Sequence, residues 1–224
     1  MNKSVEKLKN LIEANGFLAT GNDIIDKIII HGVAGSGKST LTKALAEDES
    51  YNVVNVLSKE EFDLAGRYIK KEIVTFDNKI NVLDEYLSID CHDGFQVLLA
   101  DPFQYKKTPY PANYIKKKSH RFKKELIPLL LEIGIEAEAE KEGLHIIKGS
   151  AYEKEPKGKI IAIEDDVIEY VLKHGLSICY PSCVQGQEFG IVTFYHCKEL
   201  RELERSELYI ALTRVKDELR ILQL

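Results

Sequence analysis

The chain has 224 residues, of which 44% are hydrophobic and 30% charged, and its formal net charge is −5 at pH 7. This composition is typical of a soluble globular protein, and the length allows one large domain or two small ones. No apolar run approaches the roughly 18 residues that span a bilayer, and residues 1–17 lack the apolar core of a signal peptide. Synthesis in the cytosol is therefore expected. The four cysteines show no C-x-x-C spacing, which favours reduced thiols over a zinc site.

The N-terminal half alternates predicted helices and strands. Residues 1–16 have the pattern of an amphipathic helix. Four apolar segments that follow are predicted strands, at Lys27–Ile30, Tyr51–Leu57, Lys79–Leu83 and Phe95–Ala100. The connections between them are long enough to hold helices. This order predicts an α/β unit with a parallel sheet.

A glycine-rich segment, HGVAGSGKST, follows the first of these strands at residues 31–40. It matches the pattern G-x-x-x-x-G-K-[ST], in which glycines let backbone N–H groups turn inward around a phosphate. In this pattern Lys38 reaches the β- and γ-phosphates and the Ser39 hydroxyl ligates Mg²⁺. A strand, a glycine loop and a helix in this order aim a helix N-terminus at an anion. The predicted nucleotide-binding residues are Gly32, Gly35, Ser36, Gly37, Lys38, Ser39 and Thr40.

Two further strand ends carry groups suited to phosphate chemistry. Asp84 and Glu85 follow the strand Lys79–Leu83, at the position where a phosphate-loop enzyme binds Mg²⁺ and positions the attacking water. We expect Asp84 to help hold the Mg²⁺ ion and Glu85 to orient or deprotonate the attacking water. Gln104 follows the next strand and is placed to hydrogen-bond a γ-phosphate. Together these residues favour nucleotide hydrolysis over binding alone.

The segment Lys106–Lys124 is locally basic, although the chain is acidic overall. It holds eight Lys or Arg residues and no acid, with tyrosines and a phenylalanine between them. Such a stretch can hold a phosphate backbone and stack bases, and the residues predicted to bind RNA are Lys116, Lys117, Lys118, Lys123 and Lys124. The alternative is a solvated linker with lysines at its edge.

The C-terminal half repeats the α/β pattern. Helices are predicted at Glu125–Glu132, with an interruption near Pro128, and at Asp165–His174 and Leu200–Val215. Glu136–Glu142 is expected to be a solvated acidic stretch. The predicted strands are Leu144–Lys148, Lys159–Ile163, Leu176–Tyr180, Ile191–His196 and Glu218–Leu222. Two α/β domains are therefore expected, covering residues 1–112 and 113–224.

The order of these motifs resembles a superfamily 1 helicase core. Ser119-His120-Arg121, the segment Cys183–Phe189 with the core QGQEF, and Tyr209–Arg214 with the core ALTR are similar to motifs of its second domain. The signatures GVAGSGKST, LDEY, ADPFQY, QGQEF and ALTR together resemble the triple-gene-block protein 1 family of filamentous plant RNA viruses. The resemblance covers roughly Ile28 to Ile221.

This resemblance implies two tandem RecA-like domains with parallel sheets and no accessory domains. It implies that Arg121 and Arg214 act on the transferring phosphoryl, and that Gln185, Gly186 and Glu188 link the nucleotide to nucleic acid. The predicted catalytic set is Lys38, Asp84, Glu85, Gln104, Arg121 and Arg214, with ATP or another NTP and Mg²⁺ as cofactors held partly by Ser39 and Asp84.

The function implied is that of a viral movement protein with RNA-binding NTPase activity. It would carry viral RNA through plasmodesmata, suppress RNA silencing and lie in the host cytoplasm, at plasmodesmata or in inclusion bodies. The implied partners are single-stranded viral RNA, viral coat protein, other movement proteins, host silencing factors and a second copy of the chain. Two alternatives stay open: a fragment of a replicative viral RNA helicase, and a movement factor that uses ATP only as a conformational switch. A small-molecule kinase is disfavoured because it leaves QGQEF and ALTR without a role.

Overall fold

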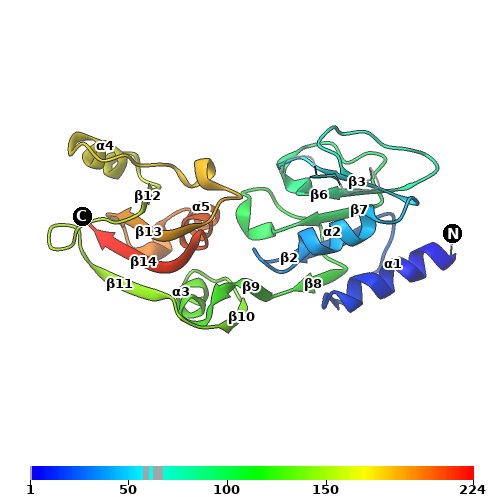
Figure 1. Cartoon of the computed structure of the whole chain (residues 1–224), viewed down its shortest axis with the longest axis horizontal. Helices are drawn as coiled ribbons and strands as arrows, with labels where there is room; N and C mark the ends of the chain where they lie inside the picture. Colours follow the sequence, from blue (N-terminus) through cyan, green and yellow to red (C-terminus); the bar gives the residue numbers. More distant parts are fainter. Residues whose placement is uncertain (1, 58–60, 63–67) are drawn as a thin grey trace. The chain divides into compact units, whose positions relative to one another are not determined.

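The computed structural model describes residues 2–57, 61–62 and 68–224 and divides into two compact units, Met1–Lys118 and Ser119–Leu224. Each unit is built on its own sheet of mainly parallel strands with helices against it (Figure 1). The α/β class with parallel sheets is therefore confirmed. None of the helices in the described part of the chain has the length and apolar character needed to cross a membrane.

The sheet of the first unit has six strands in the order β1-β8-β2-β7-β6-β3. Its bounds are β1 Leu18–Ala19, β2 Ile28–Gly32, β3 Tyr51–Asn55, β6 Ile80–Asp84, β7 Val97–Ala100 and β8 Tyr114–Lys116. The five strands from β8 to β3 are parallel, and β1 pairs antiparallel with β8. A short antiparallel pair, β4 Glu61–Phe62 and β5 Tyr68–Ile69, lies between β3 and β6 in the chain.

Both faces of this sheet are covered, which explains why its strands are apolar runs rather than alternating ones. Helices α1 (Asn2–Ala14) and α2 (Lys38–Ala46) pack on the face that carries Ile28 and Ile30. Ile29 points to the opposite face, where the 3₁₀ helix η1 (Tyr86–Ser88) and nearby loops cover the strands. Successive strand residues point to opposite faces, so β2 anchors both layers and fixes the position of the loop that follows it.

The second unit holds a four-stranded, fully parallel sheet in the order β11-β14-β13-β12. The strands are β11 His145–Ser150, β12 Lys159–Ala162, β13 Phe189–His196 and β14 Val215–Gln223. Helix α4 (Asp165–Lys173) packs its apolar side on β12, β13 and β14. The other elements of the unit are α3 Ile127–Glu132, α5 Arg205–Leu212, the strands β9 Lys118–Lys123 and β10 Glu138–Lys141, and the 3₁₀ turns η3 Lys124–Leu126, η4 Pro181–Val184 and η5 Leu200–Glu202.

Several local predictions need correction. Pro128 lies in the first turn of α3 and does not interrupt it, because the first turn of a helix needs no N–H donor from that residue. The stretch Glu136–Glu142 is exposed as expected but contains β10, which pairs with the basic β9. The predicted strand Leu176–Tyr180 is reduced to one parallel bridge, between Cys179 and Ile161 of β12.

The predicted helix Leu200–Val215 is divided into η5 and the shorter α5. The division lies at Glu204, whose carboxylate accepts the Glu207 N–H (3.0 Å) and the Ser206 hydroxyl (2.6 Å) and so caps a new helix start. The first unit also extends past residue 112, because Tyr114 and its neighbours in β8 pair with β2.

Candidate functional site

The glycine-rich loop lies between the end of β2 and the start of α2. Gly35 and Gly37 have φ angles of 75° and 97°, in the left-handed region that favours glycine. Gly32 is required for a different reason, since a Cβ there would lie 2.2 Å from the Ser36 hydroxyl oxygen and 3.2 Å from the Phe17 ring. The loop therefore takes this shape only with glycine at the two glycine positions of the motif, Gly32 and Gly37, and at Gly35 between them.

Lys38 and Ser36 give this loop the polar groups of an anion site. Lys38 is 7% exposed, and its ammonium donates to the carbonyl oxygens of Gly32 (2.8 Å) and Val33 (3.4 Å). The Ser36 hydroxyl oxygen is buried and has no hydrogen-bond partner among the described residues. A buried hydroxyl of this kind is costly unless a ligand satisfies it. Ser39 and Thr40 are exposed at the start of α2. The loop thus fits the phosphates of a nucleotide.

The acid pair lies at the end of β6, beside the ends of β3 and β7. Asp84 is buried, and its carboxylate accepts the side-chain N–H of Asn55 (2.8 Å) and the backbone N–H of Glu85 (3.1 Å). Glu85 has φ 61° and is the one non-glycine residue with positive φ in the described part of the chain. Such backbone strain concentrates at functional sites. The Glu85 carboxylate accepts the Tyr105 hydroxyl at 2.9 Å.

Burial raises the pKa of both carboxyl groups of this pair. It raises the pKa of Asp84, although the Lys38 ammonium and hydrogen bonds from Glu85 and Asn55 oppose the shift. It also raises the pKa of Glu85 to about 7, against the opposing charge of Lys38 and with a further upward push from Asp84. A carboxylate with a pKa near neutrality is suited to accept a proton at physiological pH.

Gln104 joins the same edge of the first sheet. Its side-chain N–H donates to the Asp101 carboxylate at 2.8 Å, and Asp101 is fully buried beyond the end of β7. This bond fixes Gln104 in the 3₁₀ turn η2 (Pro102–Gln104). Carboxyl ends of parallel strands meet at one edge, so the structure brings Lys38, the acid pair and Gln104 to the same edge, where ligands bind in open α/β sheets. Sequence reasoning missed the roles of Asn55, which ends the observed β3, and of Tyr105, which directly follows η2.

In the second unit, Gln185, Gly186 and Glu188 lie before β13 and Arg214 directly before β14, whereas Arg121 lies in β9. Arg121 of β9 forms an ion pair with Glu188 (2.5 Å), and Lys216 of β14 approaches the other oxygen of Glu188 at 3.5 Å. Gly186 has φ 79°, so the bend beside Gln185 also favours glycine. Glu188 is thus held by cations on two different strands.

Arg214 is buried at the junction of α5 and β14. Its Nε donates to the Ile210 carbonyl (3.2 Å) and its Nη2 to the Thr213 hydroxyl (3.2 Å). These bonds hold the guanidinium at the C-terminal end of α5, where a cation is favoured by the helix dipole. The side chain is 1% exposed, which is unusual for an arginine.

The predicted RNA-binding lysines do not share one environment. Lys116 donates to the Asn15 carbonyl (2.8 Å), lies over the Phe17 ring, and places its ammonium 3.6 Å from where a Cβ on Gly37 would be. Lys124 pairs with the Glu142 carboxylate at 2.6 Å, and Lys123 donates to the Glu142 carbonyl at 3.3 Å. Lys116 therefore belongs to the phosphate loop's surroundings, and the charge of the basic segment is partly compensated by Glu142, which directly follows β10.

The comparison with protein families is decisive for the chain as a whole. The model for the viral superfamily 1 RNA helicase core domain matches residues 28–223, from the start of β2 to the end of β14. The chain belongs to this family. The match spans the phosphate loop, the acid pair and the three motifs of the second unit.

Curated relatives define the position of the chain within this family more narrowly. It is 35% identical to the movement and silencing protein TGBp1 of Apple stem pitting virus over 218 residues, which cover 96% of this chain and 98% of the relative. It is 32% identical to the TGBp1 of Papaya mosaic potexvirus over 216 residues, covering 95% and 93%. The chain is therefore a member of the TGBp1 group within the helicase family.

Solved structures support the fold. An arterivirus nonstructural protein 10 (helicase) in complex with DNA is similar with a TM-score of 0.62 at 16% identity, over 88% of this chain. A helicase of PRRSV is similar with a TM-score of 0.57 at 14% identity, over 96% of this chain. The chain spans 60% and 54% of these two helicases.

Proposed function

We propose that this chain is a viral movement and silencing protein whose two units form an NTPase stimulated by single-stranded RNA. The loop geometry carries this proposal: three constrained glycines, a buried Lys38 and a Ser36 hydroxyl with no partner among the described residues lie at the same sheet edge as Asp84 and Glu85. The TGBp1 relatives, which are named for movement and silencing, support the biological role. The expected location is the host cytoplasm, including plasmodesmata or inclusion bodies.

The first unit supplies most of the chemistry in this proposal. Backbone N–H groups of Gly35–Lys38 and the Lys38 ammonium would hold the β- and γ-phosphates, and Glu85 would accept a proton from the attacking water. Ser39 and Asp84 would hold Mg²⁺, which neutralises charge on those phosphates when bound; one carboxylate with phosphate oxygens is a usual ligand set for this ion. Gln104 would contact the γ-phosphate and respond to its loss.

The second unit would complete the site. We propose that both units are RecA-like and that Arg214 and Arg121 act on the phosphoryl in transit, an effect worth roughly 10³–10⁵ in rate in comparable enzymes. Glu188, which pairs with Arg121, would then link the nucleotide to RNA held by Gln185 and its neighbours. RNA that favours closure of the two units would stimulate hydrolysis.

The deciding experiment measures NTP hydrolysis by the purified chain with Mg²⁺, with and without single-stranded RNA. We expect turnover that rises with RNA and is lost in Lys38→Ala, while melting temperature shows whether that variant is folded. Saturable ATP binding without turnover would support the conformational switch instead. Turnover that rises with a small hydroxyl acceptor and not with RNA would indicate a kinase.

A further inference from the structure

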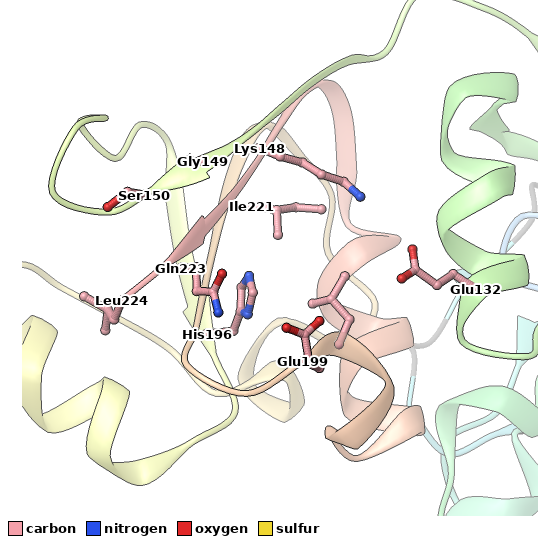
Figure 2. Close-up of a pocket in the computed structure, with 10 residues that line it drawn as sticks. Glu132, Lys148, Gly149, Ser150, His196, Glu199, Ile221, Gln223 and Leu224 are labelled. Atoms are coloured by element: carbon pink, nitrogen blue, oxygen red, sulfur yellow. The ribbon is translucent and has the colours of Figure 1, made fainter.

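A cavity lies at the carboxyl-terminal edge of the second unit's sheet. It has a volume of about 510 Å³ and is lined from the carboxyl ends of β11, β13 and β14, together with Glu132 of α3 and Glu199 and Leu200 near η5 (Figure 2). The motif residues Gln185–Glu188 and Arg214 precede β13 and β14, at the amino ends of the same parallel strands. This pocket is therefore separate from the helicase motifs. Its volume is in the usual range for a ligand pocket.

Two side chains at the centre of the pocket each donate a hydrogen bond to a nearby backbone carbonyl and keep an acceptor. His196 and Gln223 are partners in the β13–β14 register and lie on the same face of the sheet. The Nδ1 of His196 is 2.8 Å from the Lys198 carbonyl, which only accepts, so Nδ1 carries the proton and Nε2 is the acceptor of the neutral ring. Gln223 donates its side-chain N–H to the Cys197 carbonyl at 3.3 Å, which leaves its amide oxygen as an acceptor.

Two carboxylates add to this excess of acceptors. Glu199 is exposed at the pocket and forms no ion pair in the part of the chain that the structure describes. Glu132 has a long contact of 3.8 Å with Arg201, whose side chain is 73% exposed. Among the described residues, Lys148 is the one cation in the lining and extends along one wall, whereas Glu199 lies on another (Figure 2). Acceptors therefore outnumber donors, and the charged groups of the lining favour a cation over an anion.

We propose that this pocket binds an arginine side chain of a peptide segment in a protein partner. A guanidinium offers five N–H donors in a plane, which matches carboxylate, amide and imidazole acceptors better than a single ammonium does. Its methylene groups would lie on Leu200 and Ile221, and Lys148 would meet a backbone carbonyl of the same segment. Nucleic acid is the less favourable macromolecule because the two carboxylates repel its phosphates, so a protein segment is the better match for this surface.

The test uses the full chain and the capped pentapeptide Gly-Ser-Arg-Ser-Gly, with binding followed through the methyl NMR shifts of Leu200 and Ile221. We expect saturable shifts with this peptide, and little response when citrulline replaces the arginine, because citrulline keeps the shape and loses the charge. Glu199→Gln is expected to weaken binding about tenfold, the usual effect of losing a charge-assisted hydrogen bond. Glu202→Gln is the matched control, an exposed acid of the same turn outside the lining.

Several outcomes would overturn the proposal. Equal binding of the citrulline peptide, or equal losses in the Glu199 and Glu202 variants, would show that the pocket does not select a guanidinium. Free arginine binding as tightly as the peptide would identify a small-molecule site instead of a partner site. Shifts of the same methyl groups with a decauridine RNA, stronger than with the peptide, would assign the pocket to nucleic acid. Melting temperatures confirm that each variant is folded.

Discussion

At the scale of single residues, Glu85 combines backbone strain, burial and a hydrogen bond from Tyr105. In the first prediction, Glu85→Gln keeps the acceptor for Tyr105 and the side-chain size but removes the base. We expect the NTP dissociation constant to stay within about twofold and turnover to fall by roughly 10²–10⁴, the usual contribution of a general base. Equilibrium binding and single-turnover kinetics separate the two effects. A collapse of nucleotide affinity with the chemical step intact would mark Glu85 as a metal or structural group.

His31 is expected to make the free energy of unfolding depend on pH, independently of its effect on turnover. Burial, with the nearby Lys38 charge, lowers its pKa from 6.5 to about 4, and its Nε2 lies 3.0 Å from the Tyr86 hydroxyl, with which the ring stacks. Because the folded value is below the unfolded one, the unfolded chain binds more protons between about pH 6.5 and 4. The free energy of unfolding should therefore fall across this window by up to about 3 kcal/mol.

The measurement is chemical denaturation at several pH values for wild type and His31→Gln. The amide can still accept from Tyr86 but does not titrate, so the difference between the two proteins isolates His31 from other groups, including Glu85. We expect the two curves to diverge as the pH falls below 6.5. Parallel curves down to pH 4 would mean that His31 keeps its ordinary pKa in the folded chain.

At the scale of elements, three consecutive lysines at the end of β8 and the start of β9 differ in their surroundings: Lys116 and Lys118 are partly buried and Lys117 is exposed. The backbone of Lys116 accepts the Val33 N–H at 3.2 Å, and its side chain ties the end of α1 to the loop around Gly37. Burial lowers the pKa of Lys116, as expected for an ammonium removed from solvent. We therefore expect Lys116→Met to weaken NTP binding several-fold and to leave RNA affinity and its salt dependence unchanged.

The double variant Lys117→Ala/Lys118→Ala is the comparison. It should weaken RNA binding for any sequence and flatten the slope of log K against log salt by up to about 1.4, while basal hydrolysis persists. Anisotropy titrations with single-stranded RNA at several salt concentrations measure both variants. An unchanged slope in the double variant would make the basic segment a linker, and RNA would then be held elsewhere, near Gln185–Glu188.

At the scale of the whole molecule, catalysis in the proposed mechanism requires the second unit to act on a nucleotide held by the first. Arg214 tests this division. Arg214→Lys keeps one charge and a donor for Ile210 or Thr213 but loses the planar guanidinium, so turnover should fall about 10³-fold with little change in nucleotide affinity. Hydrolysis rates, ATP affinity and melting temperature are measured together. Losses of activity that only follow the loss of stability would show that Arg214 is structural.

The sequence alone determined the phosphate loop and the fold class, because these depend on interactions between residues that are close in the chain. A continuous apolar run such as Ile28–Ile30 indicates a strand that is covered on both faces. Glycines in the loop indicate backbone φ values that other residues avoid. The phosphate loop, the α/β class and the family therefore follow from the order of the residues. Pro128 shows the limit of such rules, since the same residue starts a helix or breaks it depending on where the first turn falls.

Tertiary structure decided what depends on partners distant in the chain. The lysines of one basic stretch look alike in sequence, yet Lys116 contacts Asn15, about a hundred residues away, and Lys124 pairs with Glu142, which directly follows β10. Asn55 and Tyr105 join the acid pair only because β3, which Asn55 ends, and the turn η2, which Tyr105 follows, lie beside the end of β6. The pocket around His196 likewise exists only through strand register and a loop that takes up its donors. Local pattern fixes the elements, whereas long-range pairing sets the charge and burial of each side chain.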